Sequence, residues 1–185
     1  MCQPQHVIVT GAAGALGRAV VEHFLNQGAH VHALDISDEL LAAALAGADP
    51  GRVQGYAVDL TSRPDCMRCV GSIRENAQRI DVLCNVAGGF MMGEGVAETS
   101  DETWDFLFNL NTKSVMHMAA AVVPLMRESG AGKIINVGAL AAGQGLGQMG
   151  AYIASKSATI RLTESLAAEL KPVGINVNGV LPVSY

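Results

Sequence analysis

Aromatic and charged residues are both scarce in this sequence: they make up 4% and 16% of its 185 residues. Half of the residues are hydrophobic, which excludes a chain that is disordered as a whole. Glycine and alanine are abundant instead, and such small residues allow helices to pack closely on a sheet. The length suffices for a domain with its own core, and we predict a single domain over residues 1–185.

The sequence also lacks a basic stripe, a long apolar run and a leader-like N-terminus. Its formal net charge is -5, which argues against binding to nucleic acid. No apolar stretch is long enough to cross a bilayer without interruption by Gly, Asn or a charge. Residues 1–6 show no charged start followed by an apolar run, as a secretion signal would. We therefore expect a cytoplasmic protein that binds neither membranes nor nucleic acid.

Clusters of metal ligands are missing as well. Cys66 and Cys69 form a lone C-x-x-C, without the second pair or the nearby histidines that a zinc site uses. The histidines are scattered, and only His30 and His32 share a strand face. In a chain without a secretion signal, the cysteines are expected to be free thiols. We predict that the protein holds no metal.

What the sequence does contain is a regular alternation of strand-like and helical stretches. Strand-like stretches cover residues 6–10, 30–35, 53–58, 81–86, 133–137 and 175–181. Helical spacing covers residues 16–27, 37–45, 64–79 and 152–170, and the last helix is predicted to be strongly amphipathic. A longer helix, capped by Thr99 or Ser100, is predicted to run toward Arg127, with Pro124 ending or kinking it. This order predicts a Rossmann-type, doubly wound parallel sheet in a three-layer α/β/α fold, with ligands at the carboxyl ends of the strands.

A glycine-rich turn follows the first predicted strand. Gly11, Gly14 and Gly17 stand between this strand and a helix, which is the context in which such glycines let backbone N–H groups approach a pyrophosphate. Asp35 ends the second strand, where a carboxylate accepts the ribose hydroxyls of NAD and repels a 2′-phosphate. No Arg or Lys stands at residues 12–15 to favour NADP. The turn and Asp35 predict NAD as the cofactor.

Tyr152 and Lys156 stand four residues apart, so a helix places both side chains on one face. An ammonium beside a phenol stabilises the phenolate and is expected to lower the tyrosine pKa from its usual value of about 10. Such a tyrosine can exchange a proton with an alcohol or carbonyl oxygen.

Taken together, these features resemble the short-chain dehydrogenase/reductase family. The resemblance covers the whole chain and rests on residues 10–17, 59–60, 85–88, 109–111, and on Tyr152 with Lys156. In that family the tyrosine is the general acid/base, the lysine binds the nicotinamide ribose, and an asparagine in the place of Asn111 holds a water that links the lysine to solvent. The resemblance thus implies Tyr152, Lys156 and Asn111 as catalytic residues. The residues implied in cofactor binding are Gly11, Ala13, Gly14, Leu16, Gly17, Asp35, Ile36, Asp59, Leu60, Asn85, Val86, Ala87, Gly88, Tyr152, Lys156, Pro182 and Val183.

The chain departs from the family pattern at three places. Ala15 stands where the middle glycine is usual, and Gly14 is expected to serve the turn instead. The substrate-binding serine, thirteen residues before the tyrosine, is replaced by Ala139. The family continues beyond residues 181–182 with a substrate-covering loop, a helix and a seventh strand, so we expect a C-terminally truncated domain that lacks the usual last strand.

These departures leave several functional interpretations open. The first is an NAD(H)-dependent oxidoreductase that acts on a small carbonyl, alcohol or conjugated ring, with Tyr152 as proton donor or acceptor. Dihydropteridine reductases also lack the serine, and the sequence partially resembles that branch. The alternative is a catalytically degenerate module that only binds NAD. The resemblance further implies a homodimer or homotetramer through the helices around residues 103–126 and 152–170.

Overall fold

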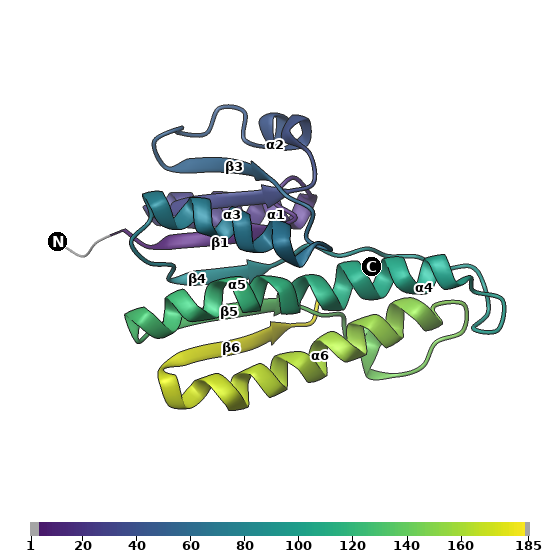
Figure 1. Ribbon diagram of the computed structural model, residues 1–185. Coiled ribbons are helices and arrows are strands. Elements are labelled where there is room, and N and C mark those ends of the chain that lie inside the picture. The colour runs from purple at the N-terminus through teal and green to yellow at the C-terminus, as the bar shows by residue number, and fades with distance from the viewer. Residues whose placement is uncertain (1–3, 184–185) are drawn as a thin grey trace.

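Six parallel strands form a single sheet in the computed structural model, which describes residues 4–183 (Figure 1). The strand order is β3-β2-β1-β4-β5-β6, so the chain reverses direction across the sheet between β1 and β4. The strands are β1 (His6–Thr10), β2 (His30–Asp35), β3 (Val53–Ala57), β4 (Val82–Asn85), β5 (Gly132–Val137) and β6 (Ile175–Val180). Within residues 4–183, β6 forms an outer edge of the sheet.

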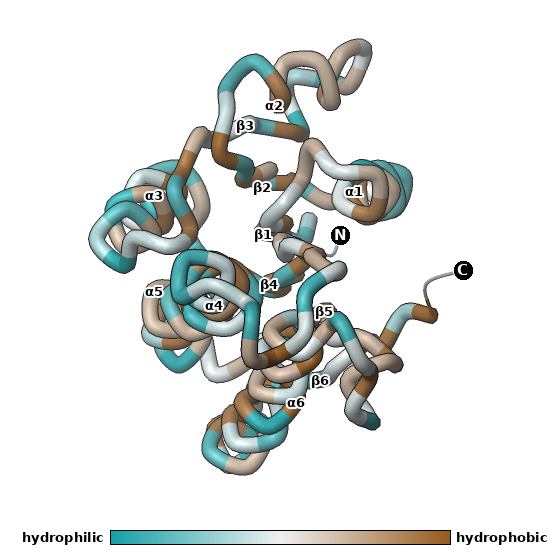
Figure 2. The backbone as a smooth tube through the Cα atoms, turned by 90° about the vertical axis from the view of Figure 1, so that its right-hand side faces the viewer, coloured by the Kyte–Doolittle hydropathy of each residue, from teal (hydrophilic) through white to brown (hydrophobic). Residues whose placement is uncertain are grey.

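Helices cover both faces of this sheet, as Figure 2 shows. The longer helices are α1 (Ala15–Asn26), α2 (Asp38–Ala44), α3 (Arg63–Asn76), α4 (Asp101–Phe108), α5 (Ser114–Ser129) and α6 (Gly150–Leu170). One apolar cluster joins α3, α5 and α6 to the sheet, and a second joins α1 and α2 to the opposite face. The predicted three-layer Rossmann-type fold is confirmed. None of the helices in residues 4–183 is long and apolar enough to span a membrane.

The long helix predicted to run toward Arg127 is interrupted, but not at Pro124. Ser100 caps α4 by accepting a hydrogen bond from the Thr103 N–H, and one wide π-helical turn, η1 (Asn109–Lys113), then separates α4 from α5. Helix α5 continues through Pro124 to Ser129, and Gly130 caps its end with a left-handed backbone. A π turn contains one residue more than an α turn, so the interruption changes which side chains face the protein interior.

Two further predictions about helices need correction. Helix α3 ends at Asn76 rather than Arg79, because Ala77 already has an extended backbone and is buried, as is Ile80 before β4. Helix α6 is not strongly amphipathic. Its buried residues include four polar ones, namely Ser155, Lys156, Thr159 and Thr163.

A histidine cluster lies at the amino-terminal end of the sheet. His6 stacks on His30 and on His32, with ring centroids 5.2 Å and 5.5 Å apart. Burial lowers the pKa of both His6 and His32, the latter to about 4, and the neighbouring imidazoles act in the same direction. The folded protein therefore favours the neutral rings.

We predict that acid destabilises the fold through this cluster. The pKa of His32 lies below the unfolded value of 6.5, so the unfolded state binds more protons once the pH falls below 6.5. The free energy of unfolding should drop between about pH 6.5 and 4, by on the order of 2–3 kcal/mol for His32. Urea unfolding at several pH values measures this. The loss should shrink in His32→Phe and persist in the exposed control His23→Gln; equal losses in both variants would contradict it.

Candidate active site

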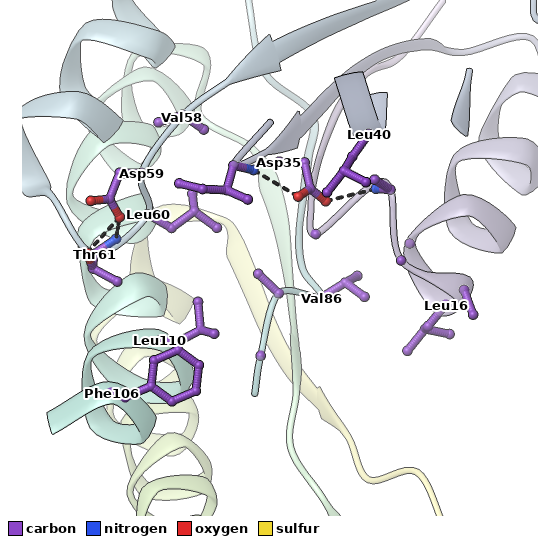
Figure 3. Close-up of a pocket in the computed structure, with 18 residues that line it drawn as sticks. Leu16, Asp35, Leu40, Val58, Asp59, Leu60, Thr61, Val86, Phe106 and Leu110 are labelled. Atoms are coloured by element: carbon purple, nitrogen blue, oxygen red, sulfur yellow. Dashed lines mark hydrogen bonds between the residues drawn. The ribbon is translucent and has the colours of Figure 1, made fainter. Parts of the chain in front are cut away.

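A cleft of about 700 Å³ opens at the carboxyl ends of β1 to β4 (Figure 3). Twelve of its lining residues were predicted to bind the cofactor: Gly11, Ala13, Gly14, Leu16, Gly17, Asp35, Ile36, Asp59, Leu60, Val86, Ala87 and Gly88. The sequence reasoning missed six others, namely Ala15, Leu40, Val58, Thr61, Phe106 and Leu110. The last two project toward the cleft from α4 and η1, and no motif marked them as ligand-binding.

The glycine turn fits closely between β1 and β4. Gly11 has a φ of +64°, and a Cβ placed on it would lie 2.8 Å from the Ala87 Cα. A Cβ on Gly17 would lie 2.0 Å from the Gly11 carbonyl oxygen. Gly14 has an ordinary φ of -71° and caps α1. A glycine here serves close packing against the Gly11 carbonyl oxygen and not a left-handed backbone. The glycines thus let the turn pack against β4 and against the start of α1.

Asp35 connects the end of β2 to this turn. Its carboxylate accepts hydrogen bonds from the Ala13 N–H (2.9 Å) and from the Ile36 N–H (2.8 Å). No Lys or Arg is among the residues that line the cleft in the described part of the chain. The rim of the cleft around Asp35 therefore carries negative charge without a compensating cation, which favours hydroxyl donors over a phosphate.

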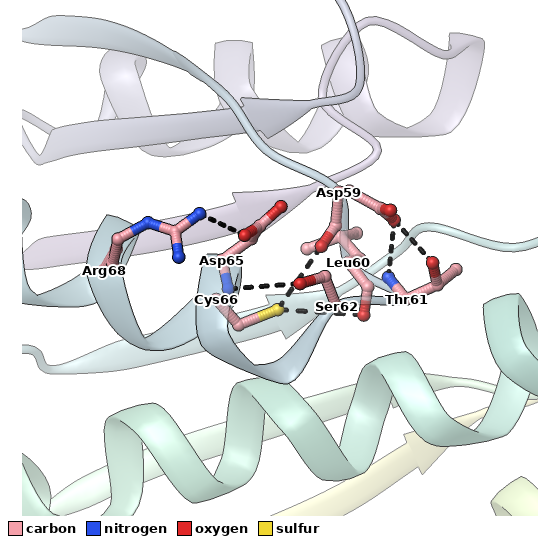
Figure 4. Close-up of polar contacts among 7 residues, drawn as sticks. All are labelled: Asp59, Leu60, Thr61, Ser62, Asp65, Cys66 and Arg68. Carbon is pink, nitrogen blue, oxygen red and sulfur yellow. Dashed lines mark hydrogen bonds and ion pairs between the residues drawn. The ribbon is translucent and has the colours of Figure 1, made fainter.

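Asp59 lies on the other side of the cleft from Asp35 (Figure 3), and Figure 4 shows the polar contacts of its side chain. Its carboxylate accepts hydrogen bonds from the N–H and the hydroxyl of Thr61, at 2.8 Å and 2.6 Å. The Cys66 thiol donates to the Leu60 carbonyl oxygen at 3.7 Å. Burial raises the pKa of Cys66 and Cys69 to about 11, so both thiols are neutral at pH 7. Cys66, Cys69 and Cys84 are free, and residues 4–183 contain no cluster of three or more His, Cys, Asp or Glu suited to a metal ion.

Two polar side chains brace the end of β4. The Thr10 hydroxyl accepts hydrogen bonds from the Val86 and Ala87 N–H groups at 3.1 Å and 3.2 Å. The Asn85 side chain donates to the Asn136 side-chain oxygen on β5 at 2.8 Å. Asn85 therefore braces the sheet. It is not among the residues that line the cleft, and its predicted contact with the cofactor stays a prediction.

The Asn111 side chain, in the π turn η1, joins the end of β4 to α6. It accepts a hydrogen bond from the Gly89 N–H (2.8 Å) and donates to the Gly89 carbonyl oxygen (3.0 Å). It also donates to the Ser155 hydroxyl oxygen at 2.9 Å. Both N–H donors and the oxygen of this buried amide therefore have hydrogen-bond partners, which fixes its orientation.

Hydroxyl groups on both η1 and α6 add further hydrogen bonds to the contact between these two elements. The Thr112 hydroxyl donates to the Ser155 carbonyl oxygen at 2.8 Å, and the Thr159 hydroxyl lies 2.9 Å from the Asn111 carbonyl oxygen. Ser155 donates to the carbonyl oxygen of Tyr152 at 2.8 Å. Sequence reasoning missed Thr112, Ser155 and Thr159. The one pattern that could have indicated Ser155 and Thr159 is the run of hydroxyl side chains on an otherwise apolar face of α6.

Lys156 is only 5% exposed and lies beside Gly88. Its ammonium donates to the Val137 carbonyl oxygen at 2.9 Å. Burial lowers the pKa of Lys156 to about 8, because the charged form loses its hydration. A Cβ placed on Gly88 would lie 2.9 Å from both Lys156 Nζ and Asn111 Oδ1, so these two groups converge on Gly88, which lines the cleft. Lys156, Asn111 and Tyr152 are not themselves among the residues that line it.

Tyr152 is half-buried beneath Phe90. The two rings meet edge to face, with centroids 4.9 Å apart and an interplanar angle of 80°. Burial raises the pKa of Tyr152 above its usual value, and the predicted lowering by Lys156 is not found. The cause is the burial of the phenol, which disfavours the charged phenolate.

The place of the missing serine is buried and apolar. Ala139 precedes a short 3-10 helix, η2 (Leu140–Gly143), and no hydrogen bond crosses from it to Tyr152. The Leu140 N–H donates to the Pro182 carbonyl oxygen at 3.2 Å, so the segment after β6 runs beside η2. Pro182 and Val183 do not line the cleft, and their predicted contact with the cofactor stays a prediction.

We predict that Gly88→Ala disrupts the convergence of Asn111 and Lys156. The added methyl group must displace one or both, which should lower the free energy of unfolding by about 1–3 kcal/mol. Urea unfolding and NADH fluorescence titration measure the effects on stability and on binding. Gly71→Ala on α3 is a matched control, since no atom lies within 4 Å of its Cβ and alanine favours a helix. A Gly88→Ala protein that is as stable as the parent and binds NADH as tightly would show that the added methyl group does not displace Lys156 or Asn111.

Comparisons with known proteins agree with this geometry. The family model for short chain dehydrogenases matches residues 5–184. An NAD-dependent glycerol dehydrogenase of Listeria innocua is 36% identical over 175 residues, which are 95% of this chain and 68% of that protein. The solved structure of an NAD+-bound xylitol dehydrogenase has a TM-score of 0.93 and 30% identity, covering 97% of this chain and 70% of that one. A metagenomic short-chain oxidoreductase in complex with NADP has a TM-score of 0.92 and 30% identity, covering 98% and 83%.

The chain therefore belongs to the short-chain dehydrogenase/reductase family. It is an oxidoreductase of that family, whose members bind nicotinamide cofactors. The similar structures include both an NAD+ and an NADP complex, so family membership alone does not select between the two cofactors.

Proposed function

We propose that the protein is an NAD(H)-dependent oxidoreductase that exchanges a hydride with a small carbonyl, alcohol or conjugated ring. The single observation that carries this proposal is the convergence of Lys156 and Asn111 on Gly88, which lines the cleft. This arrangement supports a nicotinamide beside Gly88 and a substrate oxygen near Tyr152.

The residues present fit a dinucleotide. Gly11 and Gly17 leave no room for a side chain, which keeps the turn tight and lets the N-terminus of α1 receive a pyrophosphate. Asp35, with no cation among its neighbours in the cleft, favours the free ribose hydroxyls of NAD over the 2′-phosphate of NADP. When bound, the nicotinamide supplies or accepts a hydride.

The chain's own residues then handle the proton. Tyr152 donates a proton to the substrate oxygen, or removes one in the reverse direction. Lys156 binds the nicotinamide ribose through its ammonium, and Asn111 holds the end of β4 against α6. Ala139 offers no hydroxyl to the substrate oxygen, and the loss of one such donor typically costs about 10²- to 10³-fold in rate.

A substrate that accepts hydride readily therefore suits this site better than a simple ketone. The dihydropteridine reductase-like interpretation stays a second candidate within the enzyme class for this reason. The catalytically degenerate NAD-binding module rests on the same observation, that Ala139 replaces a hydroxyl-bearing residue. We further propose action in the cytoplasm, without nucleic acid or membrane partners, as a homodimer or homotetramer.

We predict that Tyr152→Phe abolishes turnover without abolishing cofactor binding. Removal of the proton donor should lower kcat by about 10²- to 10⁴-fold, while the Kd for NADH stays within about threefold, because the phenol ring remains in place. NADH oxidation with carbonyl and quinonoid substrates, together with calorimetry, measures both quantities. If the parent protein binds NADH but turns over no substrate, the degenerate module is the better description.

We predict that Asp35 selects NAD. Asp35→Asn keeps the shape of the side chain and removes its charge, so the preference for NADH over NADPH should fall by at least about tenfold. Binding of the two cofactors, followed by fluorescence, measures the preference. Asp38→Asn, at the exposed first residue of α2, is the matched control. An unchanged preference in Asp35→Asn would remove Asp35 from this role.

A further inference from the structure

The loop after β4 is anchored at both ends around Tyr152. At its start, Gly89 is bound through its N–H and its carbonyl oxygen by the Asn111 side chain. Further along, the Gly93 N–H donates to the Gln148 carbonyl oxygen at 2.9 Å. Phe90 lies between these two anchors, so its position above Tyr152 is fixed by the backbone on either side.

The second anchor is supported by an unusual backbone conformation. Gln148 has a φ of +62°, and it is the only non-glycine residue with a positive φ in residues 4–183. A side chain disfavours this conformation, so tertiary contacts must hold it in place. One such contact is close packing of the loop on the start of α6, where a Cβ on Gly150 would lie 2.5 Å from Val96 Cγ2. The loop is thus seated on the helix turn that carries Tyr152.

The exposed surface of this loop is apolar. Phe90 covers Tyr152 with its ring and is still 56% exposed, and Met91 and Met92 are 44% and 62% exposed. A small cavity of about 190 Å³ continues from the two methionines, and the carboxylate of Glu94 is part of its lining. A substrate whose oxygen reaches Tyr152 therefore comes close to the Phe90 ring, on a loop that also carries Met91, Met92 and Glu94.

We propose that Phe90 is a specificity-determining residue that selects neutral substrates with a planar, unsaturated ring. Aromatic rings favour edge-to-face or offset contacts with one another, and thioethers also contact aromatic rings favourably. A polyol gains nothing from such a surface, because its hydroxyl groups find few partners there. An anionic substituent is disfavoured by Glu94. The inference rests on the proposed oxidoreductase function and specifies its substrate class.

Isatin and cyclohexane-1,2-dione are a suitable pair of probes, since both are neutral cyclic dicarbonyl compounds and only isatin is aromatic. In each case a carbonyl carbon gains a hydride from NADH, which becomes NAD+, and the oxygen gains a proton from Tyr152, which is reprotonated by water. The full chain should prefer isatin. Phe90→Leu keeps an apolar side chain and should lower the isatin-to-cyclohexanedione ratio of kcat/KM by about three- to tenfold, mainly through the KM for isatin.

Phe24→Leu is the matched control, because Phe24 also makes an edge-to-face ring pair, with His23 on α1, away from this loop. It should leave the ratio unchanged. If Tyr152-dependent turnover occurs but the ratio is the same in Phe90→Leu and the parent, the proposal for Phe90 is overturned while the oxidoreductase function stands.

If no turnover is found, a binding measurement tests the role of Phe90 separately from the oxidoreductase function. Calorimetry with isatin in the presence of NADH should show binding that Phe90→Leu weakens about three- to tenfold. Such binding without turnover supports the role of Phe90 and removes the oxidoreductase function. Equal isatin binding in the two proteins, or none in either, overturns the role of Phe90.

An absorbance titration of tyrosine ionisation gives a further readout that does not depend on activity. Phe90→Ala uncovers the phenol, so the pKa of Tyr152 should fall back toward 10 from its raised value. The titration of Tyr152→Phe identifies which transition belongs to Tyr152. An unchanged transition in Phe90→Ala would show that Phe90 does not cover Tyr152, and would overturn the proposal.

Discussion

The buried Asn111 amide is the contact on which the arrangement of the active site depends. Its three hydrogen bonds join two parts of the chain that the sheet alone does not connect, namely the backbone after β4 and the helix α6. A buried donor or acceptor left without a partner costs about 1–3 kcal/mol, so breaking one of these bonds destabilises the arrangement that the others hold. The amide reaches this place because one π turn rotates it inward between α4 and α5.

A second polar connection runs parallel to the first. Asn85 on β4 donates to Asn136 on β5, and Asn136 in turn donates to the Thr163 hydroxyl on α6 at 2.9 Å. The two connections explain why the buried face of α6 is rich in hydroxyl groups and why its amphipathic pattern is weak. They also hold the turn of α6 that carries Tyr152 and Lys156 against the strand ends, which apolar packing alone specifies less sharply.

Local patterns in the sequence predicted the strands, the glycine turn and Asp35, because each depends on neighbours within a few residues. The π turn could not be predicted in this way. The apolar spacing of residues 101–129 is compatible with one continuous helix, and Pro124 suggested the wrong place for an interruption. The partners of Ser155 and Thr159 were equally hidden, since they lie on η1, more than forty positions away in the chain. Such contacts are a consequence of tertiary structure.

The pKa of Tyr152 shows how burial can outweigh a favourable spacing. The spacing correctly places Tyr152 and Lys156 one helix turn apart, but the ammonium is turned to the Val137 carbonyl oxygen and the phenol is covered by Phe90. Burial disfavours the charged form of both groups, which raises the pKa of the phenol and lowers that of the amine. At neutral pH the phenol therefore keeps its proton, and Lys156, with a pKa of about 8, is still largely an ammonium. Burial thus keeps the phenol protonated at neutral pH, as the proposed role of Tyr152 as a proton donor requires.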